Sequence, residues 1–126
     1  MSYSHQLTCR IAETSADTFS ADSTEVGTVT LSDSPSFGPS VTNQLMTIAF
    51  SVTNLQSLYL LADKDLTIKT NSSGTPADTL NLKAGAALVW RKSTGYYAKP
   101  LTTDVTAFYL TTGTAATRLK YKILTT

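Results

Sequence analysis

The chain has 126 residues, of which 41% are hydrophobic and 15% are charged, and its formal net charge is +1 at pH 7. Such a length fits one domain that buries roughly two-thirds of its unfolded surface, enough for a core without a metal or disulfide. The low net charge argues against a general polyanion binder, and no apolar stretch reaches the roughly 18–20 residues of a membrane span. We expect one domain over residues 1–126, with no membrane or specific nucleic-acid partner.

Threonine and serine together make up between a quarter and a third of the residues. Threonine is β-branched and suits a pleated surface, and its hydroxyl keeps that surface soluble without charge. A helical protein would instead be rich in alanine, glutamate, lysine and leucine. The composition favours strands.

The charge is unevenly distributed along the chain. Residues 1–62 contain one basic and five acidic residues, whereas residues 63–126 contain nine basic and four acidic residues. A bipolar molecule of this kind suits contacts between copies, although both sets of charges could equally be solvated.

The first strand is predicted over Gln6–Glu13, where Leu7, Cys9 and Ile11 share one face. Residues 1–5 are expected to form a flexible arm. Cys9 is the only cysteine, so we expect a small buried hydrophobe and no intrachain disulfide. The N-terminus shows no basic segment followed by an apolar run, which predicts synthesis in the cytoplasm without a secretory signal.

The rest of the first half is less regular. Residues Thr14–Thr24 suit a loop or a poorly specified strand, and Glu25–Leu31 suits a short strand. Prolines and a glycine in Ser32–Ser40 predict no regular structure there. Leu45–Val52 is a nearly continuous apolar run, which is typical of a strand buried on both faces.

The second half contains regularly spaced strand patterns. They are Gln56–Ala62, Leu66–Thr70, Asp78–Leu82, Ala87–Arg91, Val105–Thr111 and Thr117–Ile123. Turns are predicted at 71–74 and at 83–85. The last strand is the clearest, because Leu119, Tyr121 and Ile123 alternate with three basic residues. Eight or nine strands without a helix predict an antiparallel β-sandwich, jelly roll or barrel, and we favour a jelly-roll-like sandwich.

Catalytic chemistry has little to build on in this sequence. His5 is the only histidine, and we expect it in a frayed N-terminus. Asp63 and Asp65 could hold a hard cation, but a solvated turn is the preferred interpretation because no further oxygen ligands follow. We expect a protein that is not an enzyme, with no cofactor and no metal.

Two groups of residues are candidates for partner binding. Trp90, Arg91, Tyr96 and Tyr97 could form an exposed platform that stacks sugars or bases. The preferred alternative places Trp90 and one tyrosine in the core or in an interface between subunits. The second group is Arg118, Lys120 and Lys122, which could be a solvated face or could dock on the acidic half of another copy.

The segment Leu58–Trp90 resembles a group of small tailed-phage structural proteins. The shared pattern is a hydrophobic strand, an Asp-x-Asp turn, an alternating strand, an Asn-Ser-rich turn, the motif D-T-L-N-L, a glycine turn and the strand L-V-W. The segment Tyr96–Thr112 continues the pattern. The motifs are turn and strand patterns rather than catalytic signatures.

This resemblance implies a virion component of a bacteriophage, such as a capsid decoration (cement) protein or a minor head or tail protein. It further implies a jelly-roll fold, a homo-oligomer such as a dimer or trimer, and the major capsid protein or another virion protein as partner. The alternative that we retain is a glycan- or receptor-binding β-sandwich module, which predicts an exposed Trp90, Tyr96 or Tyr97.

Overall fold

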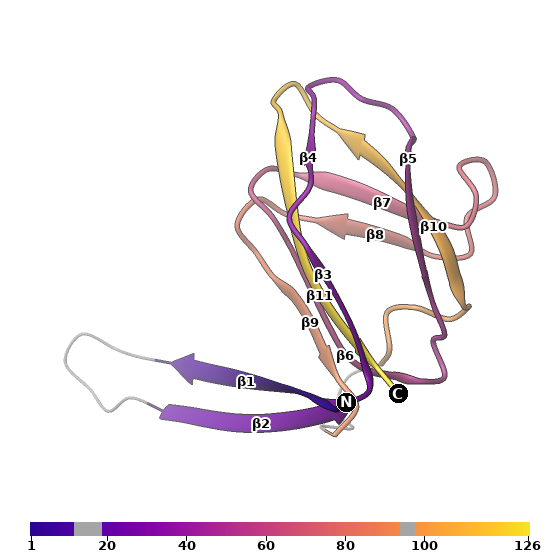
Figure 1. Ribbon diagram of the computed structural model, residues 1–126. Coiled ribbons are helices and arrows are strands. Elements are labelled where there is room, and N and C mark those ends of the chain that lie inside the picture. The colour runs from indigo at the N-terminus through magenta and orange to yellow at the C-terminus, as the bar shows by residue number, and fades with distance from the viewer. Residues whose placement is uncertain (12–18, 94–97) are drawn as a thin grey trace.

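The structure is a computed structural model that describes residues 1–11, 19–93 and 98–126 (Figure 1). Within these residues the chain forms antiparallel strands and no helix, so the predicted all-β class is confirmed. The same residues therefore contain no helix that could cross a membrane.

Eleven strands follow one another along the chain. They are β1 (Tyr3–Ile11), β2 (Phe19–Gly27), β3 (Val29–Asp33), β4 (Ser36–Phe37), β5 (Gln44–Phe50), β6 (Leu55–Ala62), β7 (Leu66–Thr70), β8 (Thr79–Leu82), β9 (Leu88–Arg91), β10 (Val105–Thr112) and β11 (Thr117–Thr125).

Strands β3 to β11 form a body of two facing sheets (Figure 1). One sheet has the order β3-β11-β6-β9, with the short β4 also paired to β11, and the other has the order β5-β10-β7-β8. Apart from β7 and β8, which are neighbours in one sheet, the successive long strands alternate between the two sheets. This connectivity of eight strands in two four-stranded sheets is that of a jelly roll.

The core lies between the two sheets and is built from alternate residues of each strand. In β10, Val105, Phe108 and Leu110 are buried, and the ring of Phe108 meets that of Phe50 edge-on at a centroid distance of 6.4 Å. The central strand β6 is buried along almost its whole length. Because each sheet covers the inner face of the other, the apolar side chains of the body are removed from water without any helix.

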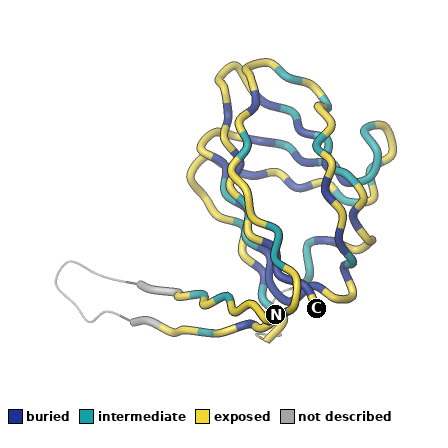
Figure 2. Tube along the Cα trace, in the orientation of Figure 1, coloured by how far each residue is buried: buried dark blue, intermediate teal, exposed yellow. Residues whose placement is uncertain are grey.

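Strands β1 and β2 form a separate two-stranded hairpin, which we call the arm (Figure 1). Nine residue pairs join its strands, from Tyr3 opposite Gly27 to Ile11 opposite Phe19. The arm projects away from the body at the end that holds the C-terminus, and its described part is mostly exposed or half-buried (Figure 2). Residues 3–5, which we expected in a flexible N-terminal arm, belong to β1.

The count of eleven strands exceeds the predicted eight or nine because β4 was not expected and because the predicted strand Glu25–Leu31 spans the end of β2 and the start of β3. Ser36 and Phe37 pair with Arg118 and Thr117, so the proline-containing segment Ser32–Ser40 does hold a short piece of strand. The end of Thr14–Thr24 lies in β2, whose polar alternation gave only a weak strand signal. Leu45 is 56% exposed, so β5 is not buried on both faces; it is an edge strand with one wet face.

Both predicted turns in the second half are present. Asn71 adopts a positive φ of 68°, and its side-chain oxygen accepts hydrogen bonds from the Thr106 backbone and hydroxyl. Gly85 has a φ of 73° and donates its N–H to the carbonyl of Ala62. Glycine and asparagine are the residues that tolerate this left-handed conformation.

Candidate binding surfaces

Trp90 lies in the core rather than on the surface. It is 8% exposed, pairs with Leu58 across the sheet, and has Lys99 Nζ 5.2 Å from its ring centroid. The preferred core placement of Trp90 is confirmed. Tyr59 lies on the opposite face of the same sheet, because it follows Leu58, the cross-strand partner of Trp90, and successive residues of a strand alternate between the faces. Tyr96 and Tyr97 lie outside the described residues.

Arg91 joins the body to the arm. Its Nη1 donates a hydrogen bond to Ser23 Oγ at 2.6 Å, and the side chain is half-buried. Sequence proximity suggested that Arg91 flanks an aromatic platform, but alternation along β9 puts it on the face away from Trp90. The structure therefore separates Arg91 from Trp90 and brings it to the base of the arm.

Arg118, Lys120 and Lys122 are all exposed on the outer face of β11. The alternating Leu119 and Ile123 are fully buried, as the pattern predicts. The same outer row ends at Leu124, which is also fully buried, at the place where the arm begins. The three cations therefore form one continuous exposed row that stops at the arm.

Apolar side chains lie beside this basic row. Leu61 pairs with Lys120 and Tyr59 pairs with Lys122, while Val89 of β9 follows Tyr59 in the next strand. Leu61 and Tyr59 are half-buried and Val89 is 42% exposed. We call this outer surface the basic face, and its residues are Tyr59, Leu61, Val89, Arg118, Lys120 and Lys122.

One end of the basic face is hollowed into an open groove of about 590 Å³. Ser36, Leu61, Asp63, Arg118 and Lys120 are among the lining residues. Asp63 Oδ1 accepts the backbone N–H of Arg118 at 2.8 Å, and Arg118 Nε donates to Ser36 Oγ at 3.2 Å. These bonds hold the neighbouring strand ends together and fix the wall of the groove.

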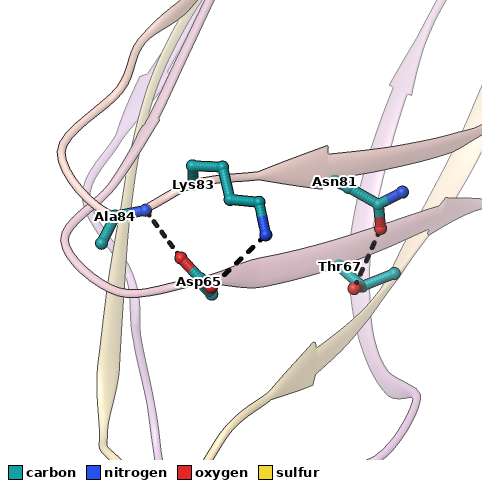
Figure 3. Close-up of polar contacts among 5 residues, drawn as sticks. All are labelled: Asp65, Thr67, Asn81, Lys83 and Ala84. Carbon is teal, nitrogen blue, oxygen red and sulfur yellow. Dashed lines mark hydrogen bonds and ion pairs between the residues drawn. The ribbon is translucent and has the colours of Figure 1, made fainter.

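Asp65 fixes the turn that precedes β7 (Figure 3). Its Oδ1 accepts the backbone N–H of Ala84 at 2.9 Å, and its Oδ2 lies 3.6 Å from Lys83 Nζ. The hydrogen bond from Ala84, followed by the charge of Lys83, lowers the pKa of Asp65. Asp63 and Asp65 thus bind different backbone groups, those of Arg118 in β11 and of Ala84 in a turn. In the described part of the chain no three His, Cys, Asp or Glu residues gather into a metal site.

The outer face of the other sheet carries polar residues on β7 and β8, and Leu45 and Tyr109 on β5 and β10. Thr67 donates its hydroxyl to Asn81 Oδ1 at 3.2 Å between β7 and β8 (Figure 3). Lys69 lies on the same strand and donates to the Ser73 carbonyl at 3.2 Å. Among the described residues, this face has one lysine where the basic face has three cations.

His5 lies at the base of the arm and is not frayed. Its Nδ1 is 3.1 Å from Ser57 Oγ, and its Nε2 is 3.2 Å from Thr30 Oγ1. Burial, and then the charge of Lys122, lower its pKa. Ser57 is only 2% exposed, so a substrate could not reach its hydroxyl. The arrangement holds β1 on the body rather than activating a nucleophile.

The other strand of the arm is attached by residues that sequence reasoning missed. Glu25 is 6% exposed, and its Oε1 accepts hydrogen bonds from both the backbone N–H and the hydroxyl of Ser93. Gly27 passes so close to β11 that a Cβ atom on it would lie 2.4 Å from the Thr125 carbonyl oxygen. The sequence gives no local sign that Glu25 is buried, because its partner Ser93 is 68 residues away.

No protein-family model, no curated protein and no solved structure matches the chain. The observations from which function is inferred are the jelly-roll body, the basic face and the arm.

Proposed function

We propose that this chain is a non-enzymatic structural subunit of a tailed-phage virion. More specifically, we propose a capsid decoration (cement) protein that binds capsid protein and copies of itself. The observation that carries the proposal is that a jelly-roll body presents two surfaces suited to macromolecular contact, the basic face and the projecting arm. Jelly rolls occur in viral capsid proteins and in lectins, so the fold favours these classes without selecting one.

The resemblance of Leu58–Trp90 and Tyr96–Thr112 to small phage structural proteins supports the virion role. Those segments supply most of β6 and β9 and all of β7, β8 and β10, which are two strands of one sheet and three of the four strands of the other, and they contain most of the core residues. The carboxylates of Asp63, Asp65 and Glu25 each accept a backbone hydrogen bond that joins two segments of the chain, which suits a structural role.

A cement subunit stabilises a shell by mass action. A protein that binds only the assembled shell lowers the free energy of that state by an amount that grows with its free concentration. A basic face with apolar side chains at its centre suits such contact, because charge orients the partner and apolar burial holds it.

The glycan-binding alternative is less well supported. It relied on an aromatic platform, and Trp90 is packed in the core under the Lys99 ammonium group. Stacking on a sugar ring needs an exposed aromatic face.

Co-sedimentation tests the cement proposal. The purified chain is mixed with empty shells of the capsid protein from the same phage and centrifuged in about 50 mM and about 500 mM NaCl, which give weak and strong charge screening. We expect saturable pelleting and a higher shell disassembly temperature, with shells of an unrelated capsid protein as control. Failure to pellet at any salt concentration would rule the proposal out.

A further inference from the structure

The three cations of the basic face form no ion pair within the described part of the chain. Arg118, Lys120 and Lys122 are exposed, and the ion pair that the described residues do contain joins Lys83 to Asp65. Residues two apart on a strand lie about 7 Å apart on the same face, so the three charges repel one another. Anions that lie beside this row of cations relieve the repulsion.

The cross-strand neighbours of these cations are all uncharged, although antiparallel sheets gain stability from opposite charges in such pairs. They are Leu61 and Tyr59 in β6, Ser32 in β3 and Ser36 in β4. Asp33 pairs with Tyr121 and therefore shares the other face of the sheet. Asp63, in the wall of the groove, accepts the backbone N–H of Arg118. The sheet itself thus supplies no carboxylate that lies across from the cations.

The apolar half of the basic face lies directly beside the cations. Leu61 and Tyr59 are half-buried in β6, and Val89 of β9 is 42% exposed. Neighbouring strands are about 5 Å apart, so one extended segment can touch the cationic row and the apolar row together. Successive side chains of such a segment point to opposite sides. Acidic residues directed to β11 would therefore alternate with apolar residues directed to β6 and β9.

The groove and the arm mark the two ends of this surface. The groove of about 590 Å³ opens at Arg118 and Lys120. At the other end, Gly27 of the arm lies against the fully buried Leu124. Arg118 and Lys122 are about 13 Å apart along the strand, a distance that about five extended residues span. The dimensions suit a short extended segment.

We infer that the basic face binds a short extended segment of another protein in which acidic and apolar residues alternate. Charge complementarity selects the acids, and the aliphatic groups of Leu61 and Val89 select the apolar residues between them. A single-stranded nucleic acid would need aromatic rings for stacking, and the basic face has one half-buried ring, that of Tyr59. The inference rests on the proposed function in taking the partner to be a protein, which in a virion would be the capsid protein.

Peptide binding tests this inference without shells. The probe is a short fluorescein-labelled peptide in which aspartate and leucine alternate, and its anisotropy is followed as the purified chain is added. In one control peptide asparagine replaces aspartate, and in another the same residues stand in one acidic and one apolar block. We expect saturable binding of the alternating peptide in about 50 mM NaCl, and a dissociation constant at least about tenfold higher in about 500 mM NaCl or for either control peptide.

Two matched variants locate the binding surface. Lys120→Glu reverses a charge on the basic face, and Lys69→Glu reverses one on the outer face of the other sheet. Circular dichroism verifies that each variant folds. We expect Lys120→Glu to raise the dissociation constant of the alternating peptide by about tenfold or more, because an attraction becomes a repulsion. Lys69→Glu should change it by less than about threefold.

The absence of saturable binding of the alternating peptide, or equal binding of the asparagine peptide, would overturn the inference. Tighter binding of a labelled oligothymidylate would assign the face to nucleic acid instead, and equal effects of Lys120→Glu and Lys69→Glu would place the site elsewhere. Co-sedimentation with shells is judged separately. A chain that binds the peptide but no shell would refute the cement role alone, and a chain that pellets with shells but binds no acidic peptide would refute this inference alone.

Discussion

The body and the arm are both antiparallel, but they differ in what packs against their strands. In the body, each sheet has the other sheet on its inner face, and Phe108, Leu110, Leu119 and Ile123 are fully buried. In the arm, a single two-stranded ribbon is attached to the body at one end only (Figure 1). The comparison teaches that strand pairing alone does not make a stable unit, because stability comes from the second layer.

The largest expected effect is the loss of a core ring in the body. Phe108→Ala should lower the free energy of unfolding by about 3–5 kcal/mol, because it leaves a cavity beside Phe50 that neighbouring strands cannot close. Urea denaturation at a fixed protein concentration measures it. Tyr109→Ala, one position along and on the outer face, is the control and should cost much less. Equal losses in the two variants would contradict the two-layer description of the body.

A smaller effect is expected where the arm meets the body. Gly27→Ala would place a methyl group 2.4 Å from the Thr125 carbonyl oxygen and 2.9 Å from Leu124 Cγ, so the arm or the end of β11 has to move. We expect a loss of about 1–3 kcal/mol in the free energy of unfolding. Gly74→Ala is the control, because a Cβ there meets nothing within 4 Å. A Gly27→Ala variant as stable as Gly74→Ala would mean that the arm does not sit on β11.

The body could be predicted from the sequence more fully than the arm, for the same physical reason. Strand β11 has a dry face and a wet face, so its apolar and basic residues alternate visibly. Strand β2 contacts the body through the polar side chains of Ser23 and Glu25, so no apolar alternation marks the contact in the sequence. The prediction that β5 is buried on both faces failed at the exposed Leu45, because an apolar run does not reveal that a strand lies at the edge of a sheet.

The candidate binding surfaces, like the fold, could be predicted from the sequence only in part. The row of Arg118, Lys120 and Lys122 follows from alternation within one strand. The pairing of this row with Tyr59 and Leu61 depends on which strand becomes the neighbour of β11, and no local pattern encodes that. Trp90 and Arg91 are adjacent in sequence but point to opposite faces, so their proximity suggested a joint site that the sheet separates.

The buried carboxylate of Glu25 sharpens the comparison at the arm base. Glu25→Gln keeps the shape of the side chain but replaces charge-assisted hydrogen bonds to Ser93 by neutral ones, at an expected cost of about 1 kcal/mol. Hydrogen exchange should become faster in β1 and β2 while β10 keeps its protection. Asp22→Asn, exposed on the same strand, is the control. If β10 lost protection as much as the arm, the arm and the body would be one cooperative unit.

The smallest effect concerns pH and the attachment of β1. Burial and the charge of Lys122 hold the pKa of His5 below its ordinary value of 6.5, so the docked arm favours the neutral ring. As the pH falls through about 6.5, a detached or unfolded arm takes up a proton that the docked arm resists, so docking weakens until the pH passes below the lowered pKa. Glu25 lies opposite His5 in the register but is bonded to Ser93, so it does not cancel this preference.

We expect faster hydrogen exchange in β1 at about pH 5.5 than at about pH 7.5, after correction for the intrinsic rate, and no such difference in β10. His5→Gln keeps polar contact with Ser57 and Thr30 without titrating, so it should abolish the difference. If the pH dependence remained in His5→Gln, another group would be responsible for it, and His5 would join the arm to the body without controlling its attachment by pH.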